Sequence, residues 1–170
     1  MKRMTALALV LALALTGCAG TKPNEKTLTP EERTQLYETT ITAARDEETN
    51  QYQSILTSAG EDDAEMVFAL LGVGAEDMSA YALSVSLMNV QAYAVAAVYP
   101  AAGKEDAVLE GLRSFVDNQK QSFEQYLVDQ YEIAANARLE TLEDGTVLLV
   151  MCENQDAVFD AIADAIVKGK

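Results

Sequence analysis

The chain has 170 residues, of which 49% are apolar, with 12 Lys and Arg against 27 Asp and Glu and no histidine. Without imidazole, Ser-His-Asp and Cys-His mechanisms are excluded, as are histidine-ligated zinc and haem. The net charge of −15 disfavours nucleic-acid binding, which depends on contacts of Lys and Arg with phosphates. Length and composition predict one globular domain with a core of ordinary size.

The N-terminus has the features of a signal peptide. Lys2 and Arg3 precede an apolar run of 12 residues, residues 4–15, which fits the apolar region of a signal peptide (about 7–15 residues) but is shorter than the roughly 20 residues that a spanning helix needs. The run leads into Leu15-Thr16-Gly17-Cys18, which resembles the bacterial lipobox. We therefore expect residues 1–17 to be a lipoprotein signal peptide and Cys18 to receive diacylglycerol. The alternatives are an ordinary secretory signal cleaved near Ala19 and a short uncleaved anchor.

A lipidated Cys18 implies a protein held at the outer face of the cytoplasmic membrane, with residues 18–28 as the lipidated cysteine and tether. Two acyl chains anchor a protein stably where one gives marginal binding. Removal of Lys2 and Arg3 leaves 10 basic residues against 27 acidic ones, a net charge of −17, so the domain should stand off anionic headgroups. Only Cys152 would then remain as a free thiol, and we expect it to be buried and inert.

Two helices are expected in residues 29–72, which we interpret as an N-terminal helical arm. Thr29-Pro30-Glu31-Glu32 has the spacing of a capping box with proline at the first helical position, and helical periodicity continues to about Ile55. Ser58-Ala59-Gly60 interrupts it. A short helix follows from Asp62 to Leu71, where Gly72 and Gly74 are stop signals.

Residues 73–170 are predicted to form a ββα-ββα domain. Alternation of large and small side chains predicts strands at 79–87 and 92–99 with a turn at Asn89, and Asp144-Gly145 predicts a second hairpin from strands at 138–142 and 146–152. Helices are expected at 103–133 and 154–167. The fold class is therefore α+β, with N-terminal helices followed by a four-stranded antiparallel sheet, and we expect both crossover helices on one face.

One face of the first hairpin is expected to carry only small side chains, where a solvated face would carry charges. These residues are Ala82, Ser84, Ser86, Ala92, Ala94 and Ala96. We expect a close cover over this face, by the N-terminal helices or by a second copy of the protein.

Several segments resemble a bacterial lipoprotein family known only as domain of unknown function 4358, met mostly in Gram-positive Firmicutes. They are the lipobox, the capped acidic helix, Glu76-Asp77-Met78-Ser79-Ala80-Tyr81, Val85-Ser86-Leu87-Met88-Asn89-Val90, Gly103-Lys104-Glu105-Asp106 and Phe115-Val116-Asp117-Asn118-Gln119-Lys120. The resemblance covers roughly residues 66–167. It implies an extracytoplasmic lipoprotein, and it brings no activity, cofactor or catalytic residue.

Candidate chemical sites are few. Glu61-Asp62-Asp63-Glu65 offers oxygen ligands without the spacing of an EF-hand, and first-turn acids are also expected from the helix dipole. A stripe of Asp156, Asp160 and Asp164 is expected to be a solvated helix face. We expect a solvated helix face and core contacts, with a polar groove as the alternative, for Gln119, Gln121, Gln125, Gln130, Tyr126 and Tyr131.

The sequence thus favours a non-catalytic binding or interaction module, with no cofactor, no metal and an unknown protein or solute partner. Nothing in the sequence marks a nucleophile beside a base. The alternative is a carboxylate-based hydrolase at the cell surface, because paired Asp and Glu form the one general acid-base device that this composition permits.

Overall fold

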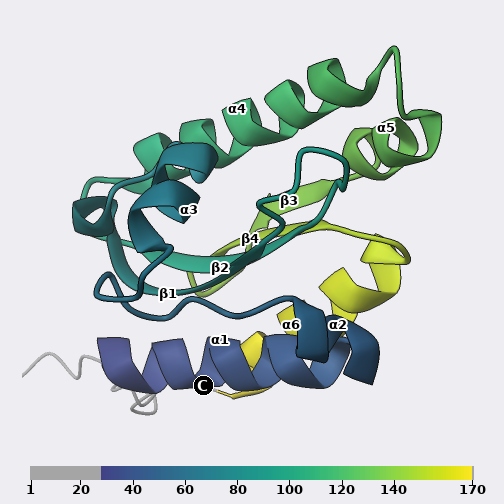
Figure 1. Ribbon diagram of the computed structural model, residues 1–170. Coiled ribbons are helices and arrows are strands. Elements are labelled where there is room, and N and C mark those ends of the chain that lie inside the picture. The colour runs from purple at the N-terminus through teal and green to yellow at the C-terminus, as the bar shows by residue number, and fades with distance from the viewer. Residues whose placement is uncertain (1–27, 170) are drawn as a thin grey trace, which may run out of the picture.

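The computed structural model describes residues 28–169, so the lipobox, Leu15, Thr16, Gly17 and Cys18, lies outside the described residues. The described chain forms a four-stranded antiparallel sheet between two layers of helices (Figure 1). This α+β architecture, with helices before the strands, confirms the predicted fold class.

The first helix, α1 (Pro30–Ala44), begins where the capping box places it. The backbone N–H of Glu32 donates to Thr29 Oγ1 at 3.2 Å, and the backbone N–H of Thr29 donates to Glu32 Oε2 at 2.9 Å. The expectation of one helix to Ile55 is wrong. The backbone is extended at Arg45 and Asp46. A separate helix, α2 (Glu47–Tyr52), then begins with Asp46 as its N-cap.

The segment before the sheet contains α3 (Ala64–Leu71) and a short 3-10 helix, η1 (Ala75–Asp77). The helix begins two residues later than expected and ends at Gly72, whose φ of 67° lies in the left-handed region that glycine enters without strain. Between α2 and α3, Leu56 pairs with Leu83 and so extends the edge of the sheet.

The sheet contains β1 (Met78–Val85), β2 (Ala94–Pro100), β3 (Arg138–Thr141) and β4 (Val147–Met151) in the order β1-β2-β4-β3. All three neighbouring pairs are antiparallel. Both predicted hairpins are therefore present, with Asn89 in the β1–β2 loop and Asp144-Gly145 in the β3–β4 turn.

Three helices follow the strands: α4 (Glu105–Phe123), α5 (Val128–Ala135) and α6 (Gln155–Lys168). The expected single helix from 103 to 133 is broken at residues 124–127. Leu127, whose φ of −135° and ψ of 76° are not helical, packs against the core, and α5 then turns back so that Ala134 is fully buried. Burial of these apolar side chains outweighs continuation of the helix.

The two crossover helices lie on opposite faces of the sheet, so the expectation of a shared face is wrong. Figure 1 shows α3, α4 and α5 on one side and α1 with α6 on the other. Phe115 and Leu112 of α4 belong to the hydrophobic core between the sheet and the layer of α3 and α4. Ile162 and Phe159 of α6 belong to a second core on the opposite face, beneath α1 and α6. The central strands are buried on both faces, and each face therefore needs its own cover.

The predicted face of small residues is also wrong, because the register of β1 and β2 divides it. Ala82 opposes Ala97 and Val85 opposes Ala94. Ala82 consequently packs in the core beneath α1 and α6, whereas Ala94 packs in the core beneath α3 and α4. Each set of small side chains lies under a different helical layer of this chain.

Candidate functional site

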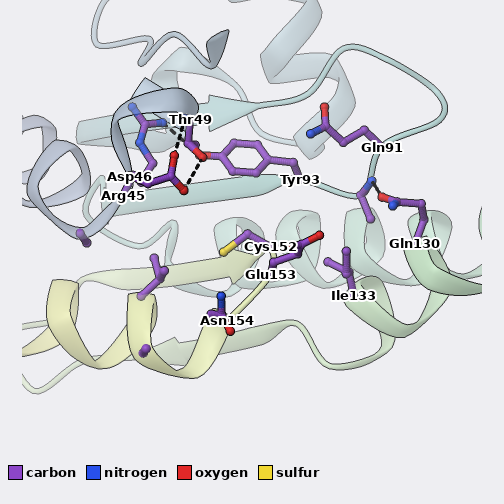
Figure 2. A pocket seen from close by; sticks show the side chains of 14 residues that line it. Arg45, Asp46, Thr49, Gln91, Tyr93, Gln130, Ile133, Cys152, Glu153 and Asn154 are labelled. Atoms are coloured by element: carbon purple, nitrogen blue, oxygen red, sulfur yellow. Dashed lines mark hydrogen bonds between the residues drawn. The ribbon is translucent and has the colours of Figure 1, made fainter. Parts of the chain in front are cut away.

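A cleft of about 540 Å³ opens at one end of the sheet, between four segments that are distant in the sequence (Figure 2). They are the turn between α1 and α2, the start of β2 with the loop before it, α5, and the turn between β4 and α6. We call this space the Tyr93 cleft. Its lining residues are Ala44, Arg45, Asp46, Thr49, Gln91, Ala92, Tyr93, Gln130, Ile133, Cys152, Glu153, Asn154, Ala157 and Val158.

Asp46 places a carboxylate at one wall of the cleft and caps α2. The backbone N–H of Thr49 donates to Asp46 Oδ1 at 2.7 Å, and Thr49 Oγ1 donates to Asp46 Oδ2 at 3.1 Å. These two hydrogen bonds, the backbone one foremost, lower the pKa of Asp46 below its ordinary value. The carboxylate is therefore held in place and ionised at neutral pH.

Arg45, the neighbour of Asp46, is half-buried and directed towards neutral acceptors. Its Nη1 donates to Ser84 Oγ at 2.8 Å and to Tyr93 Oη at 3.0 Å, and its Nε donates to Asn50 Oδ1 at 2.9 Å. Within residues 28–169, no carboxylate forms an ion pair with this guanidinium. Arg45 thus fixes the hydroxyl end of Tyr93 and joins the turn after α1 to β1 and β2.

Tyr93 and several aliphatic side chains give the cleft an apolar part. Tyr93 is 6% exposed, and its side chain extends along one wall between Arg45 and the start of β2 (Figure 2). Ala44, Ile133 and Val158 add aliphatic surface to the lining. An apolar lining with a few placed polar groups is the usual composition of a small-molecule site.

Gln130 is the one residue of the predicted glutamine and tyrosine groove that lines the cleft. Its Oε1 accepts a 2.8 Å hydrogen bond from the backbone N–H of Ala92, which ties α5 to the start of β2. Gln119, Gln121 and Gln125 lie outside the lining, Tyr126 is 83% exposed, and Tyr131 packs against the core. The structure does not bring these residues together as a groove.

Cys152 lines the cleft as a half-buried thiol rather than lying deep in the core. Burial, and secondarily the charge of Glu153, raises its pKa to about 11. The thiol is therefore protonated at neutral pH and is a poor nucleophile, in agreement with the inert thiol expected from the sequence.

Asn154 begins α6 with φ 58° and ψ 32°, the one left-handed residue other than glycine between residues 28 and 169. Asparagine tolerates this conformation better than other residues with a β-carbon. The tight turn directs the Asn154 amide towards the cleft, across from Asp46 and Tyr93 (Figure 2).

Among the acidic candidates from the sequence, Glu61 has a structural role, whereas Asp63 precedes α3 without a side-chain capping bond. Glu61 Oε1 accepts hydrogen bonds from the backbone N–H groups of Thr57 and Ser58, both at 2.8 Å. In the part of the chain that the structure describes, no group of three or more acidic or cysteine side chains is placed to hold a metal.

The aspartate stripe of α6 is an exposed face with cationic partners. Asp160 pairs with Arg138 at 2.7 Å, Asp156 lies 3.6 Å from the same arginine, and Asp164 pairs with Lys168 at 2.7 Å. These pairs agree with the expectation of a solvated stripe, because all three aspartate side chains are exposed.

Sequence reasoning missed the residues that form the cleft, Arg45, Asp46 and Tyr93 above all. Asp46 carried one usable signal, since Asp followed by Glu-Glu is a helix start of the same kind as Thr29. No local pattern brings Tyr93 to Asp46, because their approach depends on how α1 packs against the sheet.

Comparison with known proteins identifies a family whose description names no activity. Residues 52–152 match the family described as Domain of unknown function (DUF4358). No curated protein and no solved structure matches the chain. Among residues 28–169, no helix combines the length and apolar character needed to span a membrane.

Proposed function

Because the chain belongs to the DUF4358 family, whose description names no activity, we propose from its own residues that it is a lipid-anchored extracytoplasmic module that binds a solute or protein partner without transforming it. Cys18 is the anchor, and the Tyr93 cleft is the binding site. The observation that carries this proposal is the cleft itself, where an apolar wall meets a small number of fixed polar groups.

Two features of the cleft support binding rather than catalysis. The chain has no histidine, and the pKa of the Cys152 thiol is raised to about 11, so the cleft has no activated nucleophile of the Cys-His type. Asp46 has a lowered pKa, whereas a carboxyl that donates a proton at neutral pH needs a raised one.

The anchor is supported by the sequence before the described residues. Lys2 and Arg3, the apolar run and Leu15-Thr16-Gly17-Cys18 stand in the order that a lipoprotein signal requires. Placement of Cys18 on the outer face of the membrane puts the cleft in contact with solutes and proteins outside the cytoplasm.

A carboxylate hydrolase is the second candidate, and one observation favours it. Asp46 and Glu153 both line the cleft, and glycoside hydrolases act with a pair of such groups. The two functions differ in what a Glu153→Gln change does. A hydrolase loses turnover of cell-surface glycans, whereas a binding module has no turnover to lose.

The anchor is tested by metabolic labelling of cells with radioactive palmitate. We expect label in the full-length protein and none in the Cys18→Ala variant, with Cys152→Ala as the matched control that keeps its label. Label retained by Cys18→Ala would rule the lipobox out.

The binding site is tested by photo-crosslinking of the full-length protein in native membranes, followed by mass spectrometry. A photoreactive side chain is placed at Gln91, in the cleft, or at Arg113, an exposed position of α4 outside it. We expect a discrete adduct at position 91 and none at position 113. Equal adducts at both positions, or none at position 91, would contradict a binding role for the cleft.

A further inference from the structure

The Tyr93 cleft is lined by one basic residue and two acidic ones. Arg45 uses Nε and Nη1 on three neutral acceptors, Asn50, Ser84 and Tyr93. The carboxylates of Asp46 and Glu153 both line the space and form no ion pair within the described part of the chain. The lining therefore carries two negative charges against the one positive charge of Arg45, beside the aromatic ring of Tyr93.

We infer that the cleft binds a small organic cation bearing an ammonium group, an inference that rests on the proposed function of the cleft as a binding site. Asp46 accepts hydrogen bonds from the ammonium group, and Glu153 adds negative charge from the facing turn. The ring of Tyr93 offers the π-face over which ammonium groups are attracted.

Asp46 is suited to this role because its geometry is fixed before a ligand arrives. Each carboxylate oxygen receives one hydrogen bond from Thr49, and each keeps a further lone-pair site. The lowered pKa keeps the group charged well into acid solution. Because the carboxylate is already oriented, little side-chain entropy is lost when a ligand binds.

The surroundings reinforce attraction of a cation. The mature chain carries a net charge of −17, which raises the local concentration of cations in a cleft lined by negative groups. The first turn of α6 also borders the cleft, and a helix N-terminus favours anions. That turn carries Asp156, however, whose charge offsets the helix dipole.

The size of the cleft selects the ligand class. A volume of about 540 Å³ lies within the range of small-molecule sites, about 300–1,000 Å³. It accommodates an amine with a short aliphatic chain, whose methylene groups would contact Ala44, Ile133 and Val158.

Calorimetric titration of the full-length protein in non-ionic detergent tests the inference with three matched probes. They share a five-carbon chain and differ in charge: 1,5-diaminopentane, 1,5-pentanediol and glutarate. We expect heat of binding with the diamine and none with the diol or the diacid.

Substitutions then locate the site. Asp46→Asn removes the charge but keeps a good helix cap, since Asn and Asp cap equally well, and we expect it to weaken diamine binding about tenfold. Tyr93→Phe keeps the ring and should retain binding, whereas Tyr93→Leu should lose it. Asp106→Asn, an exposed change at the start of α4, is the control and should leave affinity unchanged.

The outcomes separate this inference from the proposed function. Binding of glutarate or the diol as tight as that of the diamine, or diamine binding unaffected by Asp46→Asn, overturns the ammonium assignment and leaves the cleft as a binding site. The absence of heat with all three probes also overturns the assignment. The crosslinking at Gln91 then decides independently whether the cleft binds anything.

Discussion

Arg33 of α1 forms a buried ion pair with Asp144 in the β3–β4 turn. Its Nη1 donates to Asp144 Oδ2 at 2.7 Å, and its guanidinium lies 3.9 Å from the centre of the Tyr99 ring. One turn later, Tyr37 shares a 2.7 Å hydrogen bond with Thr146. Since α1 is the first helix of the described chain, this network sets how the N-terminal end of the fold packs on the sheet.

Removal of the arginine should be costly. In the Arg33→Ala variant, the carboxylate of Asp144, whose side chain is 4% exposed, has lost its cationic partner. We expect the free energy of unfolding to fall by about 3–5 kcal/mol, as for other broken buried pairs, measured by urea denaturation.

Lys168→Ala is the matched control for Arg33→Ala. It breaks an exposed pair with Asp164 and should cost less than about 1 kcal/mol. If the free energy of unfolding fell by the same small amount in both variants, the ion pair of Arg33 with Asp144 would not stabilise the fold.

The same pair makes stability depend on pH. Burial alone would raise the pKa of Asp144, but hydrogen bonds from Arg33 and Thr146 outweigh it and hold the pKa below its ordinary value. The folded protein therefore releases this proton at lower pH than the unfolded chain does. The contribution of Asp144 is present above the unfolded pKa, about 3.9, and is lost as pH falls through the lower folded value.

Asp144→Asn should make the free energy of unfolding less sensitive to acid. The change keeps an acceptor for the backbone N–H of Thr146, which donates to Asp144 Oδ1 at 3.0 Å. We expect the variant to lose less of its stability than the parent between about pH 5 and pH 3. Thermal unfolding across that range measures it, and parallel losses in the two proteins would assign the acid dependence to other groups.

At the scale of elements, α3 and α4 meet through two glycines. A β-carbon on Gly111 would press on the backbone of Gly72, 2.9 Å from its carbonyl carbon. The three nearest atoms, which belong to Gly72 and Leu71, are all backbone atoms, so no side chain can move aside. The close crossing brings Leu71 and Leu112 into the same core.

Gly111→Ala should therefore force the helices apart even though alanine favours helix formation. We expect a loss of about 1–3 kcal/mol in the free energy of unfolding, typical of overpacking. Glu110→Ala, the exposed neighbour on α4, is the control and should change stability by less than about 0.5 kcal/mol. A gain of stability in Gly111→Ala would show that the crossing is looser than described.

The central strand β2 offers a second test at this scale, at Ala94. This residue has no exposed surface and lies between Val85 and Met151 in the sheet. Ala94→Arg should cost several kcal/mol, because it buries a charge without a partner, whereas Ala107→Arg on the exposed side of α4 should cost little. Equal melting temperatures for these two variants would mean that the layer over Ala94 does not exclude water.

At the scale of the whole molecule, the charge distribution bears on the partner that we propose. Residues 28–169 contain seven Lys and Arg, of which five form ion pairs with carboxylates of the same chain. Arg45 and Arg113 are the exceptions within that range. Residues 28–169 therefore offer no basic patch for an acidic partner, and for the proposed binding module we expect a basic or neutral partner.

Binding of that partner should weaken as salt rises. The net charge of −15 over the whole sequence creates fields that act over about 10 Å at 0.1 M ionic strength and are screened at higher salt. We expect a partner retained by the full-length protein from envelope extract to elute between about 0.1 and 0.5 M NaCl. Recovery of an acidic partner whose retention ignores salt would refute the electrostatic argument.

The sequence by itself determined the features that depend on near neighbours. The start of α1 follows from hydrogen bonds between Thr29 and Glu32, and the β3–β4 hairpin follows from Asp144-Gly145 at its turn. Such features need only residues a few positions apart, and a sequence displays them directly. Composition alone, through the absence of histidine, excluded Ser-His-Asp and Cys-His mechanisms.

Only the tertiary structure decided which face of the sheet each helix covers and where the cleft opens. The break at residues 124–127 depends on the burial of Leu127 and Ala134 against distant segments. The register that opposes Ala82 to Ala97 divides the small residues between two cores. Asp46, Tyr93 and Asn154 come together for the same reason. Burial is a property of the packed whole, so the position of a cleft follows from how layers meet rather than from any local pattern.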